Sequence, residues 1–242
     1  MLYRFFAGIL FFLFFLETNQ VFSQTDSGKL EDNKIFQSEL NIVNGEKWNY
    51  HSKYKGHPFW RENTVFTGDV NYNGQLYENL NFKFNLVNQE LILFQQVEGQ
   101  NKIYELNRKF IDTFKINNSY GDGRYQFVRR RINGEAAKRF FQQVYTGESQ
   151  CYIFHKKSVI EKIRGEYMGR YTYHPVIYIK KNHAFAAFDN NRSFLRLFDE
   201  HKKVLRRYMR KNSLSIDAEK PDEIARILKF YDSLNQQSKP DE

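Results

Sequence analysis

Residues 66–86 read FTGDVNYNGQLYENLNFKFNL, and this stretch consists of two runs in which apolar and polar side chains alternate. A period of two places alternate side chains on opposite faces of a β-strand, so both runs are predicted to be half-buried strands. Between them lies Asn73-Gly74, two residue types that tolerate positive φ. This pair favours a tight primed turn, and the stretch therefore predicts a β-hairpin.

Working outward from the hairpin, similar short runs recur about every ten residues, which is typical of antiparallel strands joined by short turns. The predicted strands span residues 90–97, 102–106, 110–116, 125–132, 139–145, 151–156, 175–181 and 184–188. Residues 158–173 show no clear period and are expected to form a short helix or a long connection. Strands and helices do not alternate along the chain, which disfavours a parallel sheet. We therefore expect an α+β protein built on a meandering antiparallel β-sheet or a partly open barrel.

The pattern changes to a helical one after residue 190. Apolar residues at helical spacing form one stripe between Phe194 and Tyr208, and a second stripe follows Pro221, a residue favoured in the first turn of a helix. Two such stripes predict a helical hairpin over residues 191–236 that packs on the sheet. The expected organisation is then a signal peptide (1–23), a flexible segment (24–34), a β domain (35–190), the helical hairpin and a loose tail (237–242).

The N-terminus has the pattern of a secretory signal peptide: Arg4, a twelve-residue apolar run over residues 5–16, and Val21-x-Ser23 before a cleavage site. Twelve helical residues span about 18 Å, whereas a hydrocarbon core is about 30 Å thick. The run therefore favours a cleaved signal over a retained anchor. No cysteine stands directly after the run, so we expect the N-terminus not to be lipidated. We expect export to the periplasm or to the periphery of the outer membrane.

The composition limits the choice of partners. The net charge is +9, which favours an anionic membrane leaflet, lipopolysaccharide or an acidic envelope protein, whereas nucleic acid is disfavoured outside the cytoplasm. Cys151 is the single cysteine, so the chain has no intrachain disulfide. Its apolar neighbours favour a buried and inert thiol; a reactive thiol or a link between two chains is the alternative.

Several segments of the chain form a pattern that extends beyond the hairpin. The hairpin has the form G-x-V-x-Y-x-G-x-x-Y-x-N between Gly68 and Asn79. The other segments are Asn44-Gly45, Gly56-His57-Pro58-Phe59, Tyr145-Thr146-Gly147-Glu148 and the helical segments 193–198 and 208–214. Together these segments resemble an uncharacterised family of exported Bacteroidetes proteins. The resemblance implies a strand domain followed by C-terminal helices, and it implies no activity. One departure is Phe84-Asn85, where many members read Y-D.

Catalytic motifs are absent from the sequence. It has no G-x-S-x-G, no phosphate-binding glycine loop and no H-E-x-x-H, and its six histidines are scattered. We therefore assign no catalytic residue, cofactor or metal. The favoured function is that of a non-enzymatic envelope protein with a binding or structural role. The alternatives are a carrier of lipid or lipopolysaccharide, which needs a cavity lined with aromatic residues, and a hydrolase with a motif-free site, which needs converging acidic or histidine side chains.

Two basic clusters are the candidate binding residues. Arg129, Arg130 and Arg131 follow one another in a predicted strand, where Arg129 and Arg131 share one face. They form either an anion site or the protective charge of an edge strand. The second cluster, in the first C-terminal helix, consists of Lys202, Lys203, Arg206, Arg207, Arg210 and Lys211. Its candidate binding residues are Lys203, Arg206, Arg207 and Arg210. It is either a solvated helix face or a surface for an anionic membrane leaflet or an acidic partner.

Overall fold

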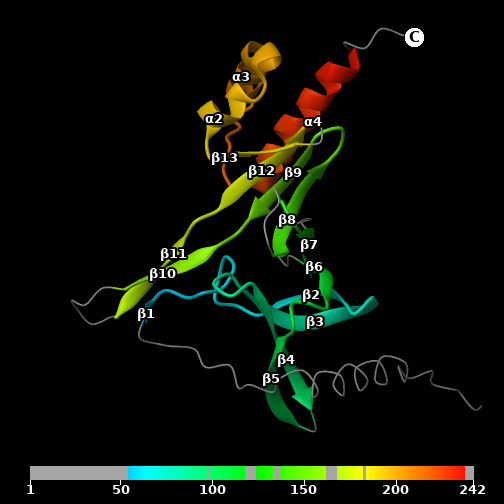
Figure 1. Ribbon diagram of the computed structural model, residues 1–242, viewed down its shortest axis with the longest axis vertical. Helices are drawn as coiled ribbons and strands as arrows, with labels where there is room; N and C mark the ends of the chain where they lie inside the picture. Colours follow the sequence, from blue (N-terminus) through cyan, green and yellow to red (C-terminus); the bar gives the residue numbers. More distant parts are fainter. Residues whose placement is uncertain are drawn as a thin grey trace, which may run out of the picture.

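The computed structural model describes residues 54–97, 99–117, 124–132, 137–161, 168–181 and 184–237. They form a ten-stranded sheet, a three-stranded sheet and a group of C-terminal helices (Figure 1). The large sheet has the strand order β13-β12-β9-β8-β7-β6-β2-β3-β4-β5, and each neighbouring pair is antiparallel. The expectation of a mostly β, α+β protein is confirmed, and the large sheet does not close into a barrel.

The first half of the large sheet is built from consecutive hairpins. Its strands are β2 (Phe66–Tyr72), β3 (Gln75–Asn85), β4 (Glu90–Val97), β5 (Gln100–Leu106) and β6 (Ile111–Asn117). The predicted turn between β2 and β3 is present: Asn73 and Gly74 have φ values of 52° and 80°. After β5 the chain returns to place β6 beside β2, so the two strands that follow one another lie four positions apart in the sheet.

This connection requires the sheet to curl. Five peptide units join Leu106 at the end of β5 to Ile111 at the start of β6, and they span about 18 Å at most. Four strand spacings in a flat sheet already cover about 19 Å. The curl brings the inward-facing side chains of the strands together, and Val70, Phe82 and Phe84 are all fully buried in one cluster. The cluster, which also contains Trp60, Phe127 and Phe140, is the core of the curled half of the sheet.

The second half of the sheet continues as a meander. Its strands are β7 (Arg124–Arg130), β8 (Arg139–Thr146), β9 (Gln150–Phe154), β12 (Val176–Lys181) and β13 (Ala184–Phe188). Cys151, in β9, is fully buried, and burial raises the pKa of its thiol. The expectation of a buried thiol is therefore confirmed.

The prediction for residues 158–173 is wrong, because this region contains two strands, β10 (Lys157–Glu161) and β11 (Gly169–Tyr173). Phe154 pairs with Val176 and Lys157 pairs with Tyr173, so the pairing register of β9 and β12 is kept in β10 and β11. The four strands form one long hairpin whose outer part extends as an arm (Figure 1) and also pairs with β1 (Tyr54–Lys55). Pro175 has no N–H to donate and interrupts the hydrogen bonds between the strands. Because of this interruption, the local sequence pattern does not predict β10 and β11.

The C-terminal helices are α2 (Asn191–Arg196), the 3-10 helix η1 (Asp199–His201), α3 (Lys202–Lys211) and α4 (Pro221–Gln237). Asn190 caps α2, and α4 begins at the predicted Pro221. The sequence predicts one continuous helix before α4. This prediction is wrong, because the chain leaves the helical conformation at Phe198. The ring of Phe198 is buried between Phe194 and Tyr231, and such packing overrides a weak local preference for helix.

The helices pack against one end of the sheet. Phe194, Phe198 and Ile227 are buried in one cluster with Ile153 of β9 and Ile179 of β12, and Figure 1 shows α4 alongside β9 and β8. Packing of these apolar residues against strands makes the helices part of the core rather than a separate appendage.

A polar contact also fixes α4 to the turn between β8 and β9. The carboxylate of Asp232 is buried and accepts hydrogen bonds from the hydroxyls of Tyr145 and Ser149, at 2.9 and 2.8 Å, and from the backbone N–H of Ser149 at 3.1 Å. Burial, together with the bond to Asp232, raises the pKa of Tyr145 to about 12. Each bond to a charged group contributes roughly 1.5–3 kcal/mol.

Candidate anion-binding site

The three consecutive arginines do not converge on one site. Strand β7 lies between β6 and β8, so the interpretation as edge-strand charge is wrong. A guanidinium nitrogen of Arg129 lies 3.6 Å from Asp112. Arg130, on the opposite face, donates a hydrogen bond of 2.6 Å to the hydroxyl of Tyr152, and Arg131 lies beyond the end of the strand and is exposed. As expected for a strand covered on both faces, part of the basic charge points toward packed side chains.

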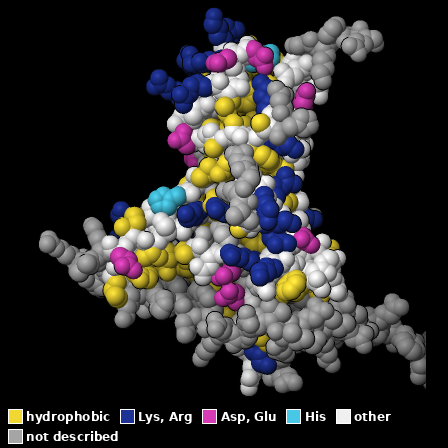
Figure 2. All heavy atoms as spheres, in the orientation of Figure 1, with side chains coloured by type: hydrophobic (Ala, Val, Ile, Leu, Met, Phe, Trp, Pro, Cys, Tyr) yellow, Lys and Arg dark blue, Asp and Glu magenta, His cyan; other side chains and the backbone are white. Residues whose placement is uncertain are grey.

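The second basic cluster contributes to a pocket between α2 and α3. Its volume is about 610 Å³. Figure 2 shows Lys and Arg side chains gathered over these helices. The lining residues are Asn191, Arg192, Leu195, Arg196, Lys202, Arg206, Met209, Arg210 and Leu214. Of the four predicted residues, Arg206 and Arg210 line this pocket, whereas Lys203 and Arg207 do not. We call it the α2–α3 pocket.

The α2–α3 pocket combines a basic rim with an apolar floor. Five of the nine lining residues carry positive charge, and no Asp or Glu lines it. Lys202 pairs with Asp199 at 3.3 Å. Among the residues that the structure describes, the four arginines of the rim have no ion-pair partner within 4.0 Å. The buried side chains of Leu195, Met209 and Leu214 form the floor. The pocket can therefore hold an anionic group next to an apolar one.

Arg192 and Arg196 are the rim residues that sequence reasoning missed. In one straight helix, Arg192 and Arg206 would stand fourteen residues apart, about 21 Å along the axis. The break at Phe198 instead folds α2 beside α3 and brings both pairs to one pocket. The available signal was the repeated spacing of four residues, Arg192 with Arg196 and Arg206 with Arg210. This spacing indicates that the two arginines of each pair lie on one face of a helix. It does not indicate which other part of the protein that face contacts.

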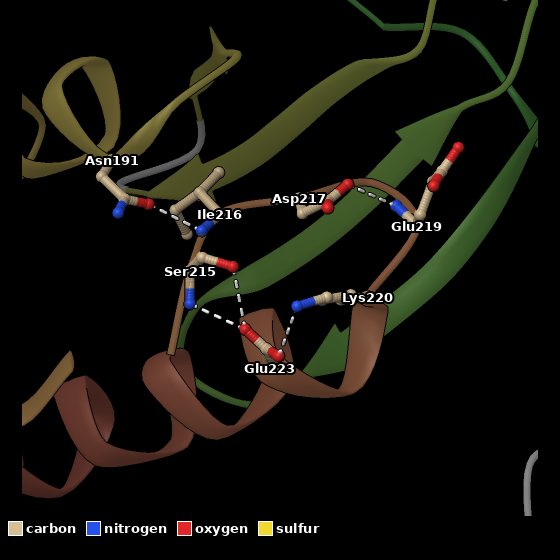
Figure 3. A network of polar contacts seen from close by, with 7 residues as sticks. All are labelled: Asn191, Ser215, Ile216, Asp217, Glu219, Lys220 and Glu223. Atoms are coloured by element: carbon tan, nitrogen blue, oxygen red, sulfur yellow. Dashed lines mark hydrogen bonds and ion pairs between the residues drawn. The ribbon is translucent and has the colours of Figure 1, made fainter. Parts of the chain in front are cut away.

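The connection between α3 and α4 holds the walls of the pocket in place (Figure 3). The side-chain oxygen of Asn191 accepts a hydrogen bond of 2.7 Å from the backbone N–H of Ile216. The Glu223 carboxylate accepts bonds from the backbone N–H and the hydroxyl of Ser215, at 2.7 and 3.0 Å, and pairs with Lys220 at 3.3 Å. The bond from the Ser215 backbone is the main reason why the pKa of Glu223 is lowered. These contacts tie Asn191 and the segment after Leu214 to α4.

A second cavity is lined by one histidine and two glutamates, the kinds of side chain that the hydrolase alternative requires. Its volume is about 460 Å³. It is lined by Trp60, Arg61, Glu62, His155, Lys157, Tyr173, Ala218 and Glu219. His155 accepts a hydrogen bond from the Tyr173 hydroxyl at 2.6 Å and donates one to the Gln142 oxygen at 2.7 Å. The Lys157 ammonium donates to the backbone oxygens of residues 57 and 59, at 2.9 and 2.6 Å. The histidine and the lysine are therefore committed to holding the fold together.

His155 should make the protein lose stability in mild acid. Burial lowers its pKa to about 3, against 6.5 for an exposed histidine. Between these values the unfolded chain binds a proton that the folded chain does not, so stability falls as the pH falls. From pH 7 to pH 5 this residue should remove about 2 kcal/mol from the free energy of unfolding, measured by urea melts. His155→Gln should lose that part of the dependence and His174→Gln, at an exposed ring, should keep it; equal slopes for all three proteins would contradict the prediction.

Comparisons with known proteins and a search for metal ligands give no further assignment. No family model, curated protein or solved structure matches the chain. In the part of the chain that the structure describes, no three side chains of His, Cys, Asp or Glu come together in a way that could hold a metal ion. Within the same residues, no helix has the length and the apolar character needed to cross a membrane.

Proposed function

We propose that the protein is an exported, non-enzymatic binding protein of the cell envelope, and that its α2–α3 pocket binds the phosphate headgroup of an anionic membrane lipid. The observation that carries the proposal is the rim of five cations around an apolar floor, with no lining carboxylate. Arginine presents a planar fork that suits phosphate oxygens, and each basic residue near an anionic leaflet contributes about 1 kcal/mol. The apolar floor suits the glycerol and first acyl carbons below the headgroup.

The size of the pocket favours a headgroup over an acidic protein. About 610 Å³ lies within the range of roughly 300–1,000 Å³ that is typical of sites for small molecules.

The carrier alternative requires a large cavity lined with aromatic residues. In the described residues the aromatic side chains instead pack against one another, as Phe114 and Phe127 do at 4.6 Å between ring centres. This arrangement supports a surface site rather than an enclosed lipid.

The proposal predicts that binding to anionic vesicles depends on the pocket and not only on net charge. The test measures binding to vesicles of phosphatidylglycerol and phosphatidylcholine, with pure phosphatidylcholine as the reference. Arg206→Glu with Arg210→Glu should weaken binding at least tenfold. Lys203→Glu with Arg207→Glu, which makes the same charge change on α3 outside the pocket, should weaken it less than threefold. All these side chains are exposed, so each variant should keep its stability within about 0.5 kcal/mol.

The two pairs of substitutions also separate a pocket from a diffuse basic surface. Equal losses in both pairs would show that the helix attracts the membrane by charge alone, which would contradict a headgroup pocket. Glycerol phosphate should compete with the vesicles in the wild-type protein, because it carries the same headgroup oxygens without the acyl chains.

Export is the second part of the proposal, and it is supported by the N-terminal pattern. Residues 1–23 lie outside the described part of the structure. We expect protein isolated from the envelope fraction to begin at Gln24, because Val21-x-Ser23 places small or modest side chains before that bond. Intact-mass measurement checks this. A mass that retains residues 1–23 would show that the segment stays as an anchor.

A further inference from the structure

A second basic pocket lies where the turn between β3 and β4 meets the strands β7, β8 and β9. It shares no residue with the α2–α3 pocket, and its volume is about 220 Å³. The lining residues are Leu86, Val87, Asn88, Gln89, Arg108, Arg129, Ala137, Lys138, Arg139, Phe140, Phe154 and Lys156. We call it the β-turn pocket. Its volume is below the range of roughly 300–1,000 Å³ that encloses larger molecules, so it favours a small group.

The charged side chains that line the β-turn pocket are all basic. Five of its lining residues are Lys or Arg, drawn from four separate parts of the chain, and no Asp or Glu lines it. Arg129 has a carboxylate partner in Asp112, at 3.6 Å, but the Asp112 side chain is 59% exposed, so water screens the pair. The Nε–H of Arg129 is buried and has no hydrogen-bond partner among the described residues. Converging cations repel one another, and an anion between them removes that cost.

Hydrogen bonds hold the turn between β3 and β4, which forms one wall of the β-turn pocket, in a defined shape. The side-chain oxygen of Asn85 accepts a hydrogen bond of 3.0 Å from the backbone N–H of Val87. The buried side chain of Gln89 donates to the backbone oxygens of Leu86 and His155, at 3.1 and 2.9 Å. Arg108 donates to the backbone oxygen of Asn88 at 3.0 Å. The turn is therefore fastened both to β9 and to the loop that carries Arg108.

Aromatic side chains and backbone position two of the cations. The Arg139 guanidinium lies 5.1 Å from the ring centre of Phe154, and Arg129 stands opposite Phe140 in the pairing of β7 and β8. Lys138 and Lys156 are exposed at the rim. Two arginines that are held by their surroundings and two exposed lysines at the rim suit an oxyanion, because the guanidinium forks fix its oxygens and the lysines add charge.

From this geometry we infer that the β-turn pocket binds a phosphate group. This inference does not rest on the proposed function, since the two pockets lie on different elements and share no side chain. The phosphate group can belong to a soluble compound or to a lipid headgroup, and both present the same oxygens to Arg129 and Arg139.

The experiment titrates the isotopically labelled full chain with inorganic phosphate at constant ionic strength and follows the backbone amide resonances of residues 87–89. In the wild-type protein these resonances should move saturably, and sodium chloride should not move them. Lys138→Glu with Lys156→Glu should weaken phosphate binding at least tenfold. Lys102→Glu with Lys109→Glu, two exposed residues outside the pocket, should change it less than twofold.

Further arms separate this site from the proposed function and from general charge. Arg206→Glu with Arg210→Glu should leave the titration of residues 87–89 unchanged, whatever it does to vesicle binding. Vesicles containing phosphatidic acid, used in place of inorganic phosphate, show whether a lipid headgroup also reaches the site. No saturable movement with either probe, or equal weakening by the two lysine pairs, would overturn the inference.

Discussion

Replacing Phe198 with alanine should lower the free energy of unfolding by about 3–5 kcal/mol, the range for a large aromatic side chain removed from a packed core. Phe198 has no exposed surface, and its ring centre lies 4.7 Å from that of Phe194 and 4.3 Å from that of Tyr231. The three rings join α2 to α4 above the sheet. Alanine would leave a cavity at this junction, because the helices on either side cannot close it without losing their own contacts. Urea unfolding measures the effect.

Val204→Ala is the matched control for Phe198→Ala. Val204 lies on α3 with 44% of its surface exposed, so its truncation should stay within about 0.5 kcal/mol. If Phe198→Ala changed the free energy of unfolding as little as this control, the helices would not be docked on the sheet in solution. The α2–α3 pocket would then lack the packing that positions its walls.

Gly68→Ala should destabilise the protein by about 3 kcal/mol, at the upper end of what overpacking usually costs. A Cβ at this position would collide with the backbone carbonyl oxygen of Lys115 in β6, the strand that pairs with β2. A backbone atom cannot rotate away as the end of a side chain can. The two strands would have to separate inside the curled half of the sheet, where β2 pairs with β6. Thermal or urea melts measure the loss.

Gly74→Val gives the comparison for Gly68→Ala. A Cβ at Gly74 has nothing within 4 Å, but φ is 80°, so valine meets only backbone strain, of about 1 kcal/mol or somewhat more. The collision at Gly68 should therefore cost clearly more than the strain at Gly74. An equal effect at both positions would show that β2 can move away from β6 at little cost.

The structural features that were predicted correctly from the sequence depend on interactions between neighbouring residues. The hairpin of β2 and β3 follows from a period of two and from Asn73-Gly74, and the start of α4 follows from Pro221. The side-chain oxygen of Asn190 caps α2 and accepts hydrogen bonds from the backbone N–H groups of Arg192 and Ser193, both at 2.9 Å. Each of these features depends on side chains within a few residues of one another, so neighbouring residues suffice to specify them.

Strand order lay outside the reach of local patterns. Nothing near Arg129 shows that β7 has a neighbour on each side, and nothing near residue 111 shows that β6 returns to β2. Both depend on pairing between distant segments, whose stability comes from a shared core rather than from local preference. The arm of β10 and β11 was missed for the same reason, since its register is inherited from β9 and β12 across Pro175.

The same distinction between local sequence and distant contacts applies to the candidate site. By itself the sequence determined that α3 is basic, and it named Arg206 and Arg210, because charge is a property of each residue alone. Only the tertiary structure decided that these two face Arg192 and Arg196 across an apolar floor while Lys203 and Arg207 do not. The deciding event is the break at Phe198, and its cause is the burial of one ring between Phe194 and a residue of α4, Tyr231, thirty-three positions along the chain.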